Sequence, residues 1–390
     1  MTPVKKKRAA ETVLTHGGRH PHTQHGFVNT PVVRGSTVVF ETLDELETPT
    51  KPYRYGRHGN PTTDAVAEII TELEGAAGTV LTPSGLSGIA IALLACLENG
   101  DDVLVTDSAY EPTRHFCNDM LSRNGVSARY YDPRIGAGIA QLIRPNTRAI
   151  FMESPGSLTF EIQDLPAVRA AAGKDIAIIF DNSWATPLFH NPLSLGADIV
   201  VHTGTKMFVG HSDAILGTVS ATAARLEAVQ RTSRGHGVNV SPDDAWLAAR
   251  GLRTLGVRMK EHQSRALELA RWLEARGDVV RVLHPGLPTH PDHRLFARDF
   301  RGSGSLFGFV LPPARRAAIA AMMDGMELYA MGYSWGGFES LMLPIDPRKA
   351  RTAVPWTEKG NLFRLHAGFE DMGELKADLE AGLKRYRAAS

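Results

Sequence analysis

Two residues with complementary chemistry, Asp181 and Lys206, follow two short apolar runs near the middle of the 390-residue chain. Residues 176–180 (IAIIF) are apolar and β-branched, which is typical of a strand buried on both faces, so Asp181 is expected at its carboxyl end. A second run, residues 199–201, precedes Thr203, Thr205 and Lys206 in a turn-rich segment. Open α/β sheets bind ligands at the carboxyl ends of their strands. The pattern therefore predicts a carboxylate and an amine at neighbouring strand ends.

A carboxylate and an amine placed in this way suit the binding of pyridoxal 5'-phosphate (PLP). A lysine can form a Schiff base with the aldehyde, while a carboxylate paired with the pyridine nitrogen keeps the ring protonated and electron-withdrawing. The alternative is a surface lysine and an aspartate that caps a helix. This stretch alone leaves both interpretations open.

Residues 82–88 (TPSGLSG) add a second signal, since they form a small-residue turn between an expected strand at 79–81 and a long apolar helix. Such a turn presents backbone N–H groups at the positive end of the helix dipole, which favours phosphate binding. The turn alone is weak evidence. Together with the hydroxyls of Thr203 and Thr205 it predicts a phosphate cup.

Three motifs carry a family resemblance: DNSWATP (181–187), TGTKMFVGHSD (203–213) and RLHAGFED (364–371). They resemble the PLP-dependent enzymes of cysteine and methionine metabolism, and the likeness extends from about residue 26 to residue 385. The resemblance implies a large α/β PLP domain with a mainly parallel, doubly wound sheet. It further implies a smaller α+β C-terminal domain, an extended N-terminal arm and PLP as the cofactor.

The resemblance also assigns roles to individual residues. It implies that the cofactor is bound by residues of two chains: Ser84, Gly85, Leu86, Tyr110, Asp181, Thr203, Thr205 and Lys206 of one chain, and Tyr55 and Arg57 of its neighbour. It implies that the substrate is bound by Tyr333, Ser334, Trp335 and Arg364. Lys206, Tyr110, Asp181 and Tyr55 are the catalytic candidates. A guanidinium can grip phosphate bidentately, which suits Arg57, and a flat ring at Tyr110 can stack on the pyridine. Arg364 lies in an expected strand, where it needs an anion, either a substrate carboxylate or a structural ion-pair partner.

The activity implied is that of a carbon–sulfur β-lyase acting on L-cystathionine to give homocysteine, pyruvate and ammonia. Glu111-Pro112 is typical of the β-lyase branch, and Tyr333 and Trp335 flank Ser334 where γ-acting relatives have an acidic and a small aliphatic residue. The alternatives are a cysteine or cystine lyase, a γ-lyase or γ-synthase, and a PLP-fold protein that binds or regulates without catalysis.

Two positions depart from the family pattern. Arg54 stands where the β-lyases carry an apolar residue, and it can meet the distal carboxylate of cystathionine or face solvent. Ser157 stands where asparagine is frequent near the cofactor hydroxyl, so we assign it no contact.

The composition, 43% hydrophobic and 22% charged, is sufficient for a large core and about two domains. We expect an arm over 1–58 that reaches a neighbouring subunit, a PLP-binding domain over 59–250 and a C-terminal domain over 251–390. Five strand-plus-helix units precede residue 213, and a long helix is expected over 241–276. The C-terminal part predicts strands at 304–311 and 361–369 and helices at 314–323 and 372–387.

A net charge of +1 without a broad basic tract argues against a nucleic-acid or membrane surface. The basic run at residues 5–8 is either a solvated terminus or a targeting cluster. Cys96 and Cys117 lie in apolar helical patterns, so reduced, buried thiols and a cytoplasmic location are expected. His20, His22 and His25 lack further ligands at suitable spacing, and no metal is expected. The implied assembly is a homo-oligomer with shared active sites, a tetramer made of two dimers, acting on a small amino-acid substrate.

Overall fold

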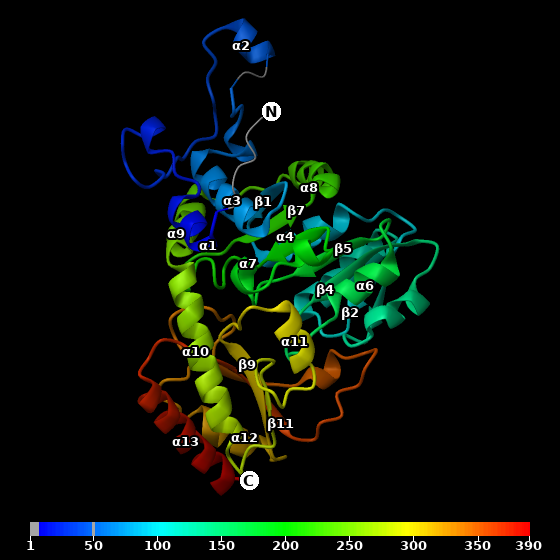
Figure 1. Ribbon diagram of the computed structural model, residues 1–390, viewed down its shortest axis with the longest axis vertical. Coiled ribbons are helices and arrows are strands. Elements are labelled where there is room, and N and C mark those ends of the chain that lie inside the picture. Colours follow the sequence, from blue (N-terminus) through cyan, green and yellow to red (C-terminus); the bar gives the residue numbers. More distant parts are fainter. Residues whose placement is uncertain (1–7, 49–50) are drawn as a thin grey trace.

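The computed structural model describes residues 8–48 and 51–390, which form two β-sheets connected by long helices (Figure 1). The larger sheet consists of β1 (Gly78–Thr82), β2 (Asp102–Thr106), β3 (Ser127–Tyr131), β4 (Thr147–Glu153), β5 (Ala177–Asp181), β6 (Ile199–His202) and β7 (Gly217–Ala221). Its order is β1-β7-β6-β5-β4-β2-β3, and β7 runs antiparallel to both of its neighbours. The prediction of a mainly parallel α/β sheet is confirmed.

The central strands are apolar because helices cover both faces of the sheet. The helices around it are α3 (Pro61–Glu74), α4 (Gly85–Leu94), α5 (Glu111–His115) with its π-helical continuation Phe116–Leu121, α6 (Leu165–Ala172), α7 (Thr186–Phe189) and α8 (Ala223–Gly235). Ile179 and Val201 belong to a core cluster with α4 and α8, whereas their neighbours Ile178 and Val200 belong to a cluster with α6. Alternate side chains therefore enter two different cores, as a doubly wound sheet requires.

Helix α3 begins at a capping box. The Asn60 side chain accepts hydrogen bonds from the N–H groups of Thr62 and Thr63, and the Thr63 hydroxyl receives the N–H of Asn60. These contacts satisfy donors that the first helical turn cannot pair. They also fix the chain direction immediately after Tyr55 and Arg57.

Two helices, α9 (Pro242–Arg253) and α10 (Leu255–Glu274), connect the two sheets where one long helix was expected. Arg258 stabilises the break at Thr254, because its side chain donates to the carbonyls of Gly251 (2.8 Å) and of the distant Met207 (2.7 Å). Gly251 also permits close packing, since a Cβ there would lie 2.3 Å from the Phe208 carbonyl oxygen. The hydrogen bonds of Arg258 therefore hold these helices against the segment that follows Lys206.

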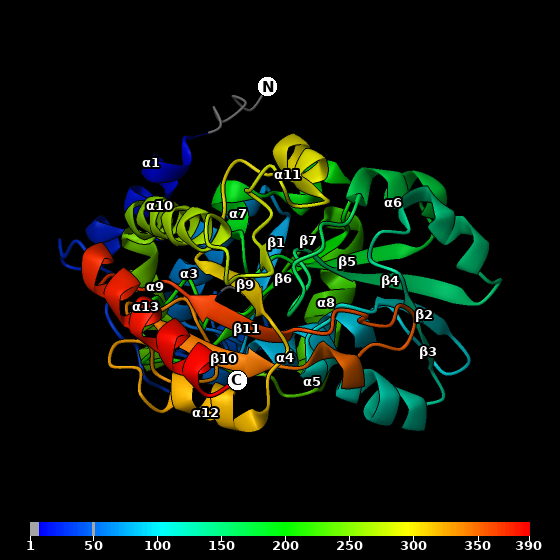
Figure 2. The same ribbon diagram turned by 90° about the horizontal axis from the view of Figure 1, so that it is seen from below.

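The smaller sheet is antiparallel and lies near the C-terminus (Figure 2). It contains β8 (Arg281–Leu283), β9 (Leu306–Leu311), β10 (Leu341–Ile345) and β11 (Asn361–His366) in the order β10-β11-β9-β8, with α11 (His293–Asp299), α12 (Arg316–Met323) and α13 (Met372–Ala388) around it. The strands and helices expected here are confirmed. The expected boundary at residue 250 lies within α9, and the division into domains stays a prediction.

The N-terminal segment has an anchored beginning and an extended remainder. Helix α1 (Ala10–His16) packs against α3 and α10 through Val13 and Leu14. The chain then extends to α2 (Leu43–Glu47), which lies far from both sheets at the top of Figure 1. Apolar side chains are open to solvent along this part, and Val39 is 77% exposed.

Several expectations concern the chain outside the site. Lys5, Lys6 and Lys7 lie outside the described residues, whereas Arg8 donates to Glu72 (2.6 Å). Cys117 is buried and Cys96 partly buried, and both thiols are unpaired. No helix within the described ranges is both long and apolar enough to cross a membrane, and no group of three potential metal ligands occurs there.

Candidate active site

Lys206 lies in the segment that follows β6, and its side chain is held by a loop of the C-terminal region. Its Nζ donates to the Ser334 hydroxyl at 2.6 Å and lies 5.6 Å from the centre of the Trp335 ring. Burial, assisted by repulsion from the Arg364 guanidinium, lowers the pKa of Lys206 to about 8. A substantial fraction of the amine is therefore neutral near physiological pH and can act as a nucleophile or a base.

Asp181 and Glu153 are the last residues of β5 and β4, and the strand register places them directly opposite one another. Asp181 is 6% exposed and accepts the Ser183 N–H at 2.9 Å. Burial raises the pKa of Asp181, and burial together with the Asp181 charge raises the pKa of Glu153 well above its ordinary value. No ion pair among residues 8–48 and 51–390 contains Asp181. A buried carboxyl in this setting favours a cationic ligand group.

The turn before α4 has the geometry of an anion cradle. Ser84 caps the helix by accepting the Ser87 N–H at 3.1 Å, and Gly85 begins the helix. A Cβ at Gly85 would lie 2.1 Å from the Thr203 hydroxyl, so the close approach of these two segments requires glycine. The Thr205 hydroxyl contacts the Leu216 backbone at both N–H (3.1 Å) and carbonyl (3.2 Å). Thr203 is therefore the more available of the two predicted hydroxyls.

These parts surround one cavity of about 260 Å³. Its lining includes the predicted residues Ser84, Gly85, Leu86, Tyr110, Asp181, Thr203, Thr205, Lys206, Tyr333, Ser334, Trp335 and Arg364. The cavity thus combines a helix N-terminus, a buried carboxyl and a largely buried amine, which suit the phosphate, the ring nitrogen and the aldehyde of PLP. The residues present therefore fit this cofactor.

Arg364 lies in β11 and faces the same cavity. Burial lowers the pKa of Arg364, and its Nη2 donates to the Ser334 carbonyl at 3.4 Å. Within the described ranges no carboxylate forms an ion pair with Arg364. The alternative role, a structural ion pair, is therefore not supported there. The guanidinium is available for an anionic ligand.

Tyr110 and Tyr333 lie at the mouth of the cavity. Tyr110 precedes α5, is 44% exposed, and donates its backbone N–H to Glu153 Oε2 at 2.7 Å. Burial and the Glu153 charge raise the pKa of the Tyr110 phenol, so it stays protonated. Tyr333 is 91% exposed. Ser334 follows it with a φ of +80°, a strained conformation that turns its hydroxyl towards Lys206.

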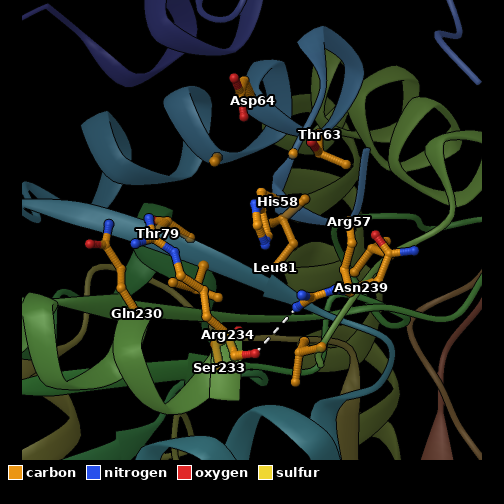
Figure 3. Close-up of a pocket in the computed structure, with 15 residues that line it drawn as sticks. Arg57, His58, Thr63, Asp64, Thr79, Leu81, Gln230, Ser233, Arg234 and Asn239 are labelled. Carbon is orange, nitrogen blue, oxygen red and sulfur yellow. Dashed lines mark hydrogen bonds between the residues drawn. The ribbon is translucent and has the colours of Figure 1, made fainter. Parts of the chain in front are cut away.

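Tyr55 and Arg57 are not brought to this cavity in their own chain. Arg57 lines a different pocket of about 280 Å³ beside α3 and α8, where its Nη1 donates to the Arg234 carbonyl at 3.3 Å (Figure 3). Tyr55 borders a further pocket on the arm. Arg54 packs over the Phe40 ring at 5.2 Å and donates to the Leu46 carbonyl.

Several lining residues were not among the predicted site residues. They are Glu153, Pro155, Gly156, Phe160, Ser183, Trp184 and Leu306, together with Ser157. Glu153 follows an apolar strand as Asp181 does, so the same argument from strand ends could have found it. Trp184 is held by a hydrogen bond from its Nε1 to the Leu306 carbonyl (2.8 Å), a contact between distant segments that leaves no local signal.

Comparisons with known proteins agree with this site. The family model of Cys/Met metabolism PLP-dependent enzymes matches residues 11–384. The chain is 49% identical to a provisionally named cystathionine beta-lyase of Rhizobium johnstonii, with 95% of each chain covered, and 40% identical to the cystathionine beta-lyase of Escherichia coli, with 96% and 98% covered. A crystal structure of cystathionine gamma synthase from Xanthomonas oryzae in complex with cystathionine gives a TM-score of 0.91 at 33% identity, covering 99% of this chain and 100% of that one. The chain belongs to the family of PLP-dependent enzymes of cysteine and methionine metabolism.

Proposed function

We propose that the chain is a PLP-dependent carbon–sulfur β-lyase that cleaves L-cystathionine. The observation that carries this proposal is the single cavity in which Asp181, Lys206 and Arg364 converge, since it offers partners for the ring, the aldehyde and a substrate carboxylate. Relatives that are 40–49% identical over nearly the whole chain bear the name of this activity. The reaction consumes one water, breaks the bond between Cβ and sulfur, and yields homocysteine, pyruvate and ammonia.

PLP, when bound, supplies a covalent link to the substrate amine and a ring that withdraws electrons from Cα. Asp181 holds the ring nitrogen protonated through its carboxylate. Lys206 is the base that removes the Cα proton, because its amine has a pKa of about 8 and lies within the cavity. Ser334 orients that amine through the 2.6 Å hydrogen bond.

Arg364 binds the α-carboxylate of the substrate and so fixes the Cα–H bond relative to Lys206. Tyr110 covers the cavity with its ring. Its phenol is protonated and can donate a proton to the sulfur as the Cβ–S bond breaks. The bulky side chains of Tyr333 and Trp335 narrow the cavity on both sides of Ser334. The smaller space favours β-elimination over γ-elimination, which needs room for a longer substrate arm.

Product analysis tests the proposal. The purified protein should be yellow when it holds the cofactor, and incubation with L-cystathionine should release pyruvate and homocysteine. A second candidate is a γ-acting enzyme, favoured by the structural likeness to the Xanthomonas oryzae gamma synthase. Release of 2-oxobutyrate and cysteine as the main products would establish that reaction instead. Rates with L-cystine and L-cysteine as competing substrates identify a lyase for smaller substrates.

We infer further that the cavity is completed by a second copy of the chain, through Tyr55 and Arg57 of that copy. Two observations support the inference. Arg364 is the only arginine that lines the Lys206 cavity of the described chain, and the arm exposes apolar side chains such as Phe27 (72%) and Leu43 (65%). The family resemblance predicts that two such dimers form a tetramer, and light scattering on the native protein measures this.

Unpaired thiols suit a reducing compartment, so we place the enzyme in the cytoplasm.

Mixing two inactive variants tests the shared site. A dimer of one Lys206→Ala chain and one Arg57→Ala chain contains one cavity with both lesions and one with neither, so the mixture should regain part of the activity. Chains labelled with two tags show whether subunits exchange. If exchange occurs and no activity returns, the arm serves its own chain.

A further inference from the structure

The connection between β10 and β11, residues 346–360, is tied to the larger sheet. It contains the short helix η6 (Pro347–Lys349) and leads into β11, the strand that carries Arg364. In Figures 1 and 2 this orange segment leaves the smaller sheet and extends towards β2. A contact that fixes the connection therefore also fixes the beginning of the strand that binds the substrate carboxylate.

Asp107 provides the first contact. It follows β2, is 1% exposed, and precedes Tyr110 by three positions. Its carboxylate accepts the N–H groups of Thr352 (3.0 and 3.1 Å), Ala353 (2.9 Å) and Val354 (2.9 Å) and the Thr352 hydroxyl (3.0 Å). Three successive N–H groups directed at one carboxylate form an anion-binding nest, here filled by a side chain of the same protein.

Arg114 strengthens this arrangement. Its Nη1 donates to Asp107 Oδ1 at 2.9 Å, its Nη2 donates to the Thr352 hydroxyl at 2.9 Å, and its guanidinium stacks 3.6 Å from the centre of the Tyr130 ring. Burial alone would disfavour a charged Asp107, but the hydrogen bonds from the 352–354 backbone and from Arg114 outweigh it and hold the pKa of Asp107 below its ordinary value. The carboxylate is therefore charged and fully paired.

A second contact joins the same connection to the loop over residues 156–161, which also contributes to the cavity. The side chains of Arg351 and Glu161 are both almost fully buried and form an ion pair, and Arg351 also donates to the Thr159 hydroxyl. The Glu161 carbonyl accepts the N–H of Gly156 at 2.9 Å, and Gly156 lines the cavity. Residues 351–354 thus contact two loops that each contribute to the active site.

We propose that Asp107 is a positioning residue, which fixes the substrate-binding strand β11 relative to the loop that carries Tyr110. Asp107 does not line the cavity, so it acts through Arg364 and Tyr110 and contacts neither substrate nor cofactor. The role rests on the proposed β-lyase function and adds to it a determinant of substrate affinity. Loss of the contact leaves Lys206 and Asp181 in place but loosens the guanidinium that receives the α-carboxylate.

Asp107→Asn tests this role on the PLP-loaded enzyme. The amide keeps the size of the side chain but replaces one acceptor oxygen with an NH₂ group that faces backbone donors. We expect KM for L-cystathionine to rise about tenfold, kcat to change less than about threefold, and the visible absorbance to persist. Asp346→Asn is the matched control, because Asp346 lies in the same connection, is 42% exposed, and pairs with Arg348. Its kinetic constants should equal those of the wild type.

A double-mutant cycle separates positioning from general stability. If Asp107 acts through Arg364, then Asp107→Asn should raise KM much less in an Arg364→Lys background than in the wild type. Full additivity, or a wild-type KM in Asp107→Asn, would overturn the proposal. Should Asp107→Asn fail to fold, Thr352→Val removes the hydroxyl between Asp107 and Arg114 and is held to the same two criteria. A wild-type protein that releases no pyruvate from cystathionine refutes the proposed function instead, which distinguishes the two failures.

Discussion

The low pKa of Lys206 predicts that the catalytic lysine destabilises the cofactor-free protein. Its pKa falls from 10.5 to about 8 on folding, so the folded state binds this proton less tightly than the unfolded state does. Well below pH 8 both states are protonated and the full cost applies, whereas well above 10.5 both are neutral and the cost disappears. Replacement by methionine removes the titratable group and with it this cost.

The magnitude follows from the two pKa values. A difference of about 2.5 units corresponds to about 3 kcal/mol at pH 7 and about 1.5 kcal/mol at pH 9.5, and solvent that reaches the partly buried amine lowers both figures. Lys206→Met should therefore stabilise the cofactor-free protein relative to wild type by about 1–2 kcal/mol more at pH 7 than at pH 9.5. Loss of the Ser334 hydrogen bond lowers the stability of the variant by a similar amount at both pH values. The change in the stability difference between pH 7 and pH 9.5 therefore reports the charge of the amine alone.

Urea unfolding of cofactor-free protein measures this, with wild type and variant at one chain concentration because association adds to the apparent stability. Lys359→Met is the control for the same exchange at an exposed position, where a change under about 0.5 kcal/mol is expected. A stability difference between Lys206→Met and wild type that is the same at pH 7 and pH 9.5 would refute the reasoning. So would one that grows with pH.

Further predictions concern turnover. Lys206→Ala should lower kcat by several orders of magnitude while PLP still binds without a covalent link, which activity and gel filtration of the loaded protein measure. Asp181→Asn should lower kcat by roughly two to three orders of magnitude, because the ring nitrogen loses its charged partner. Glu153→Gln should change kcat less than about threefold, because burial raises the pKa of Glu153 well above its ordinary value and so disfavours its charged form, and a large loss would show that its charge matters. Arg364→Lys should raise KM about tenfold or more with a smaller effect on kcat, because an ammonium cannot replace the bidentate guanidinium.

The ends of buried strands were predictable from the sequence, because a short apolar, β-branched run bounded by polar residues is typical of a buried strand and of few other structures. Residues 176–180 and 199–201 therefore located Asp181 and Lys206 correctly, and the turn before α4 followed from its small residues. The antiparallel direction of β7 could not be predicted, since a short strand buried throughout reads the same in either direction. The break at Thr254 likewise depends on Arg258, which contacts a segment distant in sequence.

The polar connections of the site were the least accessible to sequence reasoning. Asp107 reads as an ordinary turn residue after a strand, and its partners at 352–354 are backbone groups whose identity carries no side-chain signal. Tyr55 and Arg57 present the opposite case. Their types suit phosphate binding, but their place in the described chain is remote from Lys206, and only a second chain can test that role.

The position of β1 has a consequence for how the protein is made. β1 is the first strand of the larger sheet to be synthesised, yet it forms the edge and pairs with β7 alone, in a register that joins Gly78 to Ala221. A nascent chain must therefore keep β1 unpaired until the last strand of that sheet has left the ribosome. Ser84 and Gly85 follow β1 directly, so the anion cradle forms at the end of this process. A chain truncated before residue 217 should retain β2 to β6 but expose β1, and it should be degraded or bound by chaperones before it can hold the cofactor.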